Sequence, residues 1–263
     1  MLRTNFLKLF LGIFMFSSVF GFYSCSEDAG PDDGSGTGGT TQTTLLGKYN
    51  LSDNDNYGSV EFTGDNKYIV TKFLDSANGS MSAKSSAETK YIIVIFGDYT
   101  VSNQSTEKNY VVDLQQFGTI TINISDSGSI DVTINDGENT YNYTADKTEE
   151  VTQSANKTKL LCYTWKLEKT VEDGVETPGS KNYSLTFTTA GTYHFQDIDE
   201  SDAYYGYGVW EWIDDKTLKV MKYADHPDDE DLFGNITILK LTEKELVAYE
   251  KGEDWEGTGY LYR

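Results

Sequence analysis

Residues 184–195 read SLTFTTAGTYHF, and their pattern gives the clearest prediction of secondary structure in the chain. On either side of Ala190-Gly191, apolar and polar residues alternate with a period of two, which is the pattern of a β-strand with one face turned to a core. Ala190-Gly191 is a turn signal, so the stretch predicts an antiparallel hairpin. One face of the hairpin carries Leu185, Phe187, Tyr193 and Phe195, and the other carries Thr186, Thr188 and His194.

The same alternation on both sides of this hairpin predicts eight strands in the C-terminal part of the chain. Short turn sequences such as Asp214-Asp215-Lys216 separate the strands, so neighbours in sequence pair in space. Eight antiparallel strands connected in this way close into an up-and-down barrel. We expect them near residues 161–169, 182–188, 191–198, 205–214, 217–223, 234–241, 245–251 and 257–263.

The hairpin has a counterpart earlier in the chain. The strand Ser184-Leu185-Thr186-Phe187-Thr188 repeats Ser59-Val60-Glu61-Phe62-Thr63, and three other segments repeat in the same order at offsets between 111 and 125 residues. A constant order with variable spacers predicts two copies of one domain with loop insertions. We therefore expect an all-β chain of two tandem antiparallel barrels, at residues 44–147 and 158–263.

Residues 1–24 have the features of a secretory signal peptide. Arg3 and Lys8 supply a positively charged start, and residues 9–20 form an apolar stretch of 12 residues. Such a stretch is too short to span a bilayer and has the usual length of a signal-peptide core. We expect this segment to be absent from the mature chain.

The end of this segment, Phe22-Tyr23-Ser24-Cys25, resembles the lipobox of bacterial lipoproteins, in which the cysteine is acylated and becomes the first mature residue. The resemblance implies lipidation of Cys25. The acidic residues 26–33 resemble the surface-export signal of Bacteroidota lipoproteins, although a solvated acidic linker has the same composition. Residues 34–43 are rich in Gly and Thr and complete a flexible tether over residues 25–43.

The second copy resembles the lipocalin-like domains of Bacteroidota lipoproteins. The resemblance rests on its opening residues 160–167, on Leu185-Thr186-Phe187-Thr188 with Gly191-Thr192-Tyr193, on Gly208-Val209-Trp210-Glu211-Trp212 and on its closing residues 259–263. It covers residues 160–263 and, more weakly, residues 45–147. It implies a lipid-anchored protein of the outer membrane, exposed on the surface of a Gram-negative bacterium, with two lipocalin-like barrels.

The charge and the residue counts exclude several classes of function. The chain has 42 acidic and 21 basic residues, and a formal net charge of −21 opposes binding to nucleic acid. The chain has only two histidines, which makes a histidine-dependent catalytic triad improbable. The sequence also contains no nucleotide-binding or metalloprotease motif. We therefore expect no catalytic residues, no cofactor and no enzymatic activity. Lipidation of Cys25 would leave Cys162 without a disulfide partner.

Three short motifs leave alternatives open. The acidic loops at residues 53–58 and 225–231 have oxygen ligands of the kind that bind calcium, but solvated loops of an acidic protein have the same composition. We therefore predict no metal site. Asp75-Ser76-Ala77 matches a short O-glycosylation sequon of Bacteroidota proteins, which also occurs by chance.

Aromatic residues suggest where a ligand would bind. The run from Tyr204 to Trp212 brings three tyrosines and two tryptophans to the start of one strand, and such rings stack on sugars or line the mouth of a cavity. In the alternative interpretation Trp210 and Trp212 point into the core. We expect the ligand site at Tyr204, Tyr205, Tyr207 and His226.

The sequence leaves two functions open. The first is a non-enzymatic lipoprotein that binds a small molecule or glycan through a barrel and reaches the membrane through its lipid. The alternative is a module that docks on another envelope protein, of unknown identity, without a small ligand.

Overall fold

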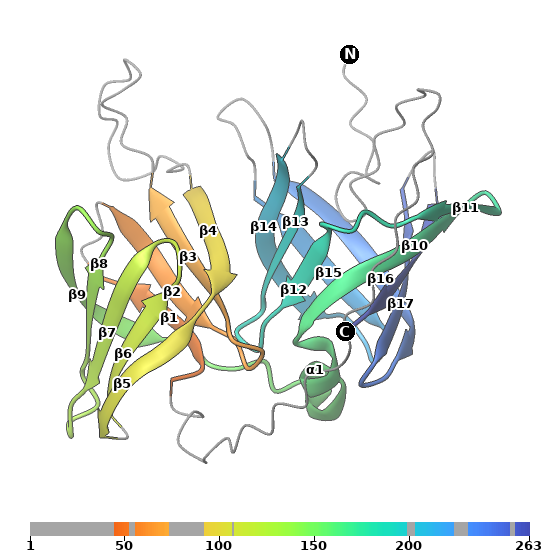
Figure 1. Cartoon of the computed structure of the whole chain (residues 1–263). Coiled ribbons are helices and arrows are strands. Elements are labelled where there is room, and N and C mark those ends of the chain that lie inside the picture. Colours follow the sequence, from red (N-terminus) through yellow and green to blue (C-terminus); the bar gives the residue numbers. More distant parts are fainter. Residues whose placement is uncertain are drawn as a thin grey trace, which may run out of the picture.

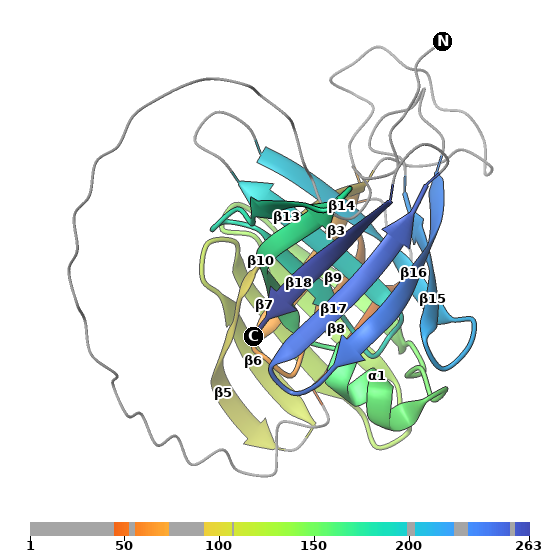
Figure 2. The same ribbon diagram turned by 90° about the vertical axis from the view of Figure 1, so that its right-hand side faces the viewer.

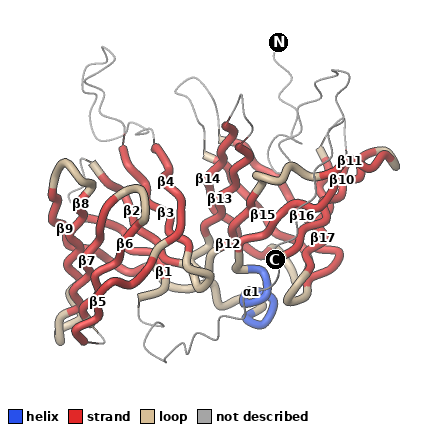
Figure 3. The backbone as a smooth tube through the Cα atoms, in the orientation of Figure 1, coloured by secondary structure: helices blue, strands red, loops and turns tan. Residues whose placement is uncertain are grey.

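The computed structural model describes residues 45–52, 56–73, 92–106, 108–198, 203–223, 231–252 and 256–263 (Figure 1). These residues form two nine-stranded antiparallel sheets, of which one is a nearly closed barrel and the other a closed barrel. The prediction of an all-β chain with two antiparallel barrels is confirmed. Figure 3 shows that strands dominate both halves and that one short helix lies beneath the second.

The first barrel is a meander in which each strand pairs with the next, except β4 with β5, and in which β1 also pairs with β9. The order β4-β3-β2-β1-β9-β8-β7-β6-β5 leaves β4 and β5 at the two edges, and these edges are consecutive in sequence. The strands are β1 (Gly47–Leu51), β2 (Tyr57–Phe62), β3 (Lys67–Phe73), β4 (Ile92–Asp98), β5 (Thr100–Thr106), β6 (Asn109–Leu114), β7 (Gly118–Ile124), β8 (Ile130–Asn135) and β9 (Thr140–Lys147).

The second barrel closes through the pairing of its first long strand, β10, with its last strand, β18. Figure 2 shows these two strands side by side with β17, β16 and β15. The helix α1 (Ala155–Leu161) precedes the barrel. Its strands are β10 (Thr164–Glu172), β11 (Val175–Pro178), β12 (Ser184–Phe187), β13 (Thr192–Ile198), β14 (Ala203–Trp212), β15 (Thr217–Lys222), β16 (Leu232–Leu241), β17 (Glu245–Lys251) and β18 (Glu256–Tyr262).

The second barrel differs from the expected eight strands in two places. The extra strand β11 pairs with the end of β10 through a two-residue turn, in which Asp173 and Gly174 have φ of 50° and 79°. Two positive φ values in succession are the geometry of a type I′ hairpin turn. The other difference is at Leu161, where the alternation predicts the start of a strand and the structure has the end of α1.

The helix α1 closes one end of the second barrel. Leu161 belongs to the barrel core, and the Trp212 indole donates to Thr158 Oγ1 at 2.9 Å. The last residue, Arg263, donates to the Leu160 carbonyl, so β18 also ends beside the helix. No helix in the described part of the chain is long and apolar enough to cross a membrane.

The two barrels have separate cores and meet through their outer faces. The Thr164 N–H, at the start of β10, donates to Asp65 Oδ2 in the β2–β3 turn at 2.9 Å. The strands β3 and β4 lie nearest to β12, β13 and β14 in Figure 1. Polar residues on these outer faces are buried as a result, among them Glu61, Thr186, Thr192 and His194.

Candidate functional site

The structure describes the side chains of two of the four predicted ligand residues. Tyr205 and Tyr207 lie on the outer face of β14, where Tyr205 is 45% exposed and Tyr207 is buried. Tyr204 pairs through its backbone with Asp197 on β13, and its side chain is not among those described. His226, Cys25 and Ser76 lie outside the described residues, as do most of the two acidic loops.

Tyr207 lies between the two barrels. The Lys48 ammonium, on β1, donates to the Tyr207 hydroxyl at 3.2 Å and lies 5.8 Å from the centre of its ring. Burial lowers the pKa of Lys48, but the charges of Tyr207 and Glu61 outweigh it and raise the pKa above its ordinary value. Burial raises the pKa of the Glu61 carboxyl. The hydrogen bond with the Thr188 hydroxyl and the charge of Lys48 lower it, but burial has the larger effect.

His194 is also enclosed at this contact. Its ring stacks on Phe96 of the first barrel with 4.5 Å between ring centres. Burial lowers the pKa of His194 to about 3, so its imidazole is neutral at physiological pH. The alternation placed His194 correctly on the outer face of its hairpin, but it gave no signal that another barrel covers that face.

Trp210 and Trp212 point into the core of the second barrel, as the alternative interpretation held. Their rings meet edge to face at 6.0 Å. The Trp210 indole donates to the carbonyls of Thr188 and Thr192 at 3.2 and 3.1 Å. Both tryptophans therefore serve packing.

The residue that stands out inside the second barrel is Glu250. It lies on β17, two and four residues after the core residues Ala248 and Leu246, so its side chain points inward. The side chain is nearly fully enclosed, since the residue is 3% exposed, and neither carboxyl oxygen has a hydrogen-bond partner among the described residues. Burial alone raises the pKa of Glu250 to about 8.

Two further polar groups line the same part of the interior. Burial, with the nearby charges of Glu250 and Asp197, raises the pKa of the Tyr183 hydroxyl well above its ordinary value. Asp197 follows Tyr193 and Phe195 on the inward face of β13, and its Oδ1 is buried without a hydrogen-bond partner in the described part of the chain. The Tyr183 ring stacks on Phe195 at 6.4 Å.

Two inward glycines lie on the strand that pairs with the strand of Glu250. Gly257 on β18 pairs with Glu250, and Gly259 pairs with Ala248. Both glycines are inward positions at the start of β18, and this strand ends beside α1. The group formed by Glu250, Tyr183, Asp197, Gly257 and Gly259, which we call the acidic interior, therefore lies at the end of the barrel away from α1.

The corresponding part of the first barrel is filled. The register Ile120–Ile134–Tyr141 on β7, β8 and β9 matches Ile236–Glu250–Gly257 on β16, β17 and β18. Tyr141 and Tyr143 stand where the second barrel has Gly257 and Gly259. The Tyr57 ring packs on Tyr141, Tyr143 and Phe117 at 5.3, 6.5 and 5.9 Å.

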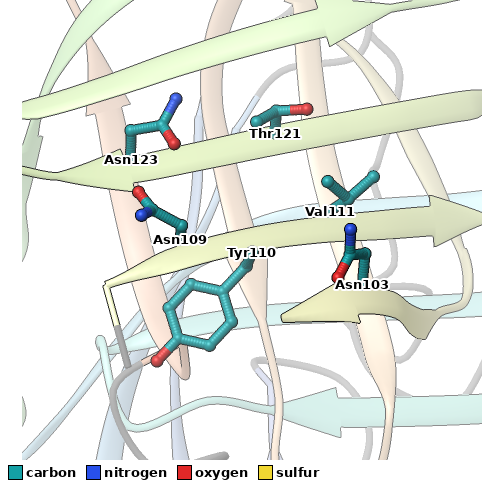
Figure 4. A pocket seen from close by; sticks show the side chains of 6 residues that line it. All are labelled: Asn103, Asn109, Tyr110, Val111, Thr121 and Asn123. Carbon is teal, nitrogen blue, oxygen red and sulfur yellow. The ribbon is translucent and has the colours of Figure 1, made fainter. Parts of the chain in front are cut away.

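A hollow of about 190 Å³ lies elsewhere, on strands β5, β6 and β7 of the first barrel (Figure 4). Figure 4 shows three asparagine amides and Thr121 on one side of these strands, whereas the Tyr110 ring points to the other side, into the core. The hollow therefore offers hydrogen-bonding amides without a ring on which a sugar could stack. It is lined by Asn103, Asn109, Tyr110, Val111, Thr121 and Asn123.

The acidic interior was missed at the sequence level, although one signal was present. The alternation predicts the strand 245–251 and gives Leu246 and Ala248 one face, on which Glu250 is the charged exception. A charged residue on an inward position is rare unless it is paired or functional. In the described part of the chain, no group of three or more His, Cys, Asp or Glu residues could hold a metal ion.

Some solved structures are similar to parts of this chain at low sequence identity. No protein-family model matches the chain, and no curated protein matches its sequence. A lipocalin-like protein from Bacteroides uniformis is similar at 10% identity and a TM-score of 0.31, over 39% of this chain and 97% of that one. An uncharacterized protein from Bacteroides eggerthii is similar at 11% identity and a TM-score of 0.29, over 39% of this chain and 98% of that one.

A third solved structure is matched over more of the chain. This is a "putative outer membrane protein" from Bacteroides fragilis, with 10% identity and a TM-score of 0.26, over 84% of this chain and 98% of that one. All three of these solved structures come from species of Bacteroides.

Proposed function

We propose that this chain is a non-enzymatic lipoprotein of the outer membrane, anchored through Cys25, whose second barrel binds a small ligand in the acidic interior. The observation that carries the proposal is Glu250, a carboxyl 3% exposed, with no hydrogen-bond partner among the described residues and two glycines beside it. A buried polar group without a partner costs free energy. Such a group persists where a ligand completes its hydrogen bonds.

The matched bonds of the two barrels support their origin as copies of one unit. The Tyr49 hydroxyl donates to the Leu45 carbonyl at 2.8 Å, and the Trp165 indole donates to the Leu161 carbonyl at 2.9 Å, each four residues back. With the same architecture in both copies, a change of lining in one of them indicates specialisation. The second barrel has glycines and an enclosed carboxyl where the first has rings.

The lack of enzymatic activity is supported by the state of the histidine that the structure describes. General base catalysis requires a group that reaches substrate and titrates near the working pH. His194 is 1% exposed, is stacked between the barrels and has its pKa lowered to about 3. It is therefore unsuited to proton transfer with a substrate in solution.

A ligand screen that compares the wild type with a variant carrying a bulky side chain in the acidic interior tests the binding proposal. Ligand-detected NMR of the full mature chain against small metabolites and glycans should give hits that Gly259→Tyr abolishes, because this change installs the ring of Tyr143. The matched control is Tyr143→Phe in the first barrel, which should keep every hit. Hits that persist in Gly259→Tyr, with its fold verified by circular dichroism, would place the site elsewhere, and a module without a small ligand would give no hits.

Fractionation tests the anchor. Cys25→Ala should release the protein from membranes into the soluble fraction, because the acyl chains supply the hydrophobic attachment. Incorporation of a labelled fatty acid into the Cys25→Ala variant at the wild-type level would contradict lipidation of Cys25. Cys162→Ala is the control and should leave both membrane association and labelling unchanged.

A further inference from the structure

The acidic interior carries more carboxylates than Glu250 alone. Asp197 lies on the inward face of β13, and Glu172 on β10 pairs with Gly257, which pairs in turn with Glu250. Glu250 and Glu172 therefore flank one glycine on the same rung. Three carboxylates from three strands line one end of this barrel.

We propose that the acidic interior binds an organic cation, an amine or ammonium group on an apolar body, with Glu250 as its ion-pair partner. This inference rests on the proposed function and names the chemical class of its ligand. A buried carboxylate is stable when a cation is paired with it in the same enclosed space. A ligand ammonium supplies both the charge and the hydrogen-bond donors that the Glu250 oxygens lack.

The described part of the protein supplies no cation of its own to Glu250. Burial is the cause of the upward shift of its pKa to about 8. The other titratable groups that line this end are Tyr183, Asp197 and Glu172. The inward lysine, Lys222, is on β15, is separated from β17 by β16 and is engaged in a contact of its own.

The spacing of the carboxylates favours an organic cation over a metal ion. Neighbouring strands lie about 4.8 Å apart, so the backbones of Glu250 and Glu172 are about 10 Å apart across Gly257. Calcium would need six to eight oxygens at about 2.3–2.6 Å. Among the described residues no cluster meets even a three-ligand requirement.

The walls suit the body of such a ligand. The stacked rings of Tyr183 and Phe195 present aromatic surface next to the carboxylates, and ring faces attract organic cations. Gly257 and Gly259 on the neighbouring strand β18 have no side chains, where the first barrel holds two tyrosines. The net charge of −21 also raises the local concentration of cations around the protein.

The test compares three probes of one length on the full mature chain. By isothermal titration calorimetry at pH 7.5, n-hexylammonium should bind at least tenfold more tightly than 1-hexanol, and hexanoate should bind more weakly than either. Glu250→Gln should weaken n-hexylammonium at least tenfold and leave 1-hexanol unchanged. Glu243→Gln, in the exposed β16–β17 turn, is the matched control.

A second measurement does not depend on the variant. Because Glu250 must ionise to pair with the amine, binding near pH 6.5 should release about one proton, seen as different heats in buffers of different ionisation enthalpy. Equal affinities for the amine and the alcohol, or binding without proton release, would overturn the inference while leaving a ligand-binding barrel in place. Absence of any hit in the wider screen would instead overturn the proposed function.

Discussion

The two barrels share a register but treat one of their ends differently. On matching rungs, the first has Ile134, Tyr141 and Tyr143, and the second has Glu250, Gly257 and Gly259. In the first barrel Tyr57 joins these rings and donates from its hydroxyl to Asp136 Oδ2 at 2.9 Å. The first barrel is thereby closed by packed rings, of which Tyr57 is hydrogen-bonded to Asp136, and the second keeps an enclosed carboxyl without a described partner.

The loops add to the contrast. In the first barrel, β6 and β7 are joined by a tight turn over residues 115–117, and Phe117 packs on the Tyr57 ring. In the second barrel, the corresponding connection between β15 and β16 runs over residues 223–231. Under the proposed function, a few inward positions at one end decide whether the same barrel scaffold is filled by its own side chains or binds a ligand.

By contrast, one hairpin is the same in both barrels, namely β2–β3 in the first and β12–β13 in the second. The Tyr99 N–H donates to the Asn66 carbonyl at 2.9 Å, and the Trp210 N–H donates to the Gly191 carbonyl at 2.8 Å. Asn66 and Gly191 both have positive φ, at 60° and 76°. A buried aromatic residue is thus fixed against the same turn in each copy.

The largest expected effect comes from removing that aromatic anchor. Trp210→Ala should lower the free energy of unfolding of the second barrel by roughly 4–5 kcal/mol, because it opens a cavity and removes the indole hydrogen bonds to two carbonyls. Tyr99→Ala, which removes the donor to the Thr63 carbonyl, should cost the first barrel roughly 3–4 kcal/mol. Urea unfolding measures both, and an effect in one barrel alone would break the equivalence of the hairpins.

A smaller effect distinguishes the second barrel from the first by the pH dependence of its stability. The pKa of Glu250 is raised from about 4.5 in the unfolded chain to about 8 in the folded one, so folding takes up a proton between these values. Stability from this group is complete below pH 4.5 and is lost as the pH rises through 8. Glu250→Gln should therefore stabilise the second barrel by about 3 kcal/mol at pH 8 and hardly at all at pH 4.5.

Unfolding midpoints of the wild type and of Glu250→Gln across this pH range measure the difference. The other carboxylates titrate in both proteins, so their contribution cancels in the comparison. Glu243→Gln should show no such pH-dependent gain. A constant difference from pH 4.5 to 8 would mean that Glu250 is not enclosed in the way the structure has it.

The alternation of apolar and polar residues was sufficient to predict the barrels, because the pleat of a strand links sequence parity to a face. It placed eight of the strands of the second barrel within a few residues, including β17 and β13. It missed β11, because Val175–Pro178 is an exposed edge strand with no apolar face. Parity also cannot show what covers an outer face, and so it left Tyr207 as a ligand residue.

The smallest effect concerns Tyr207 and sharpens the distinction between the inner and outer faces of the second barrel. Tyr207→Phe keeps the ring but removes the acceptor for the Lys48 ammonium at 3.2 Å. Because both groups are enclosed between the barrels, the loss should cost about 1 kcal/mol of stability and leave ligand binding unchanged. Tyr205→Phe, on the same face but 45% exposed, is the matched control and should cost almost nothing.

A double-mutant cycle with Lys48→Met should show that the two losses are not additive, since each removes the same bond. If instead Tyr207→Phe weakens the ligand and leaves stability intact, the ligand lies on the outer aromatic strand as the sequence suggested, and not in the interior beside Glu250.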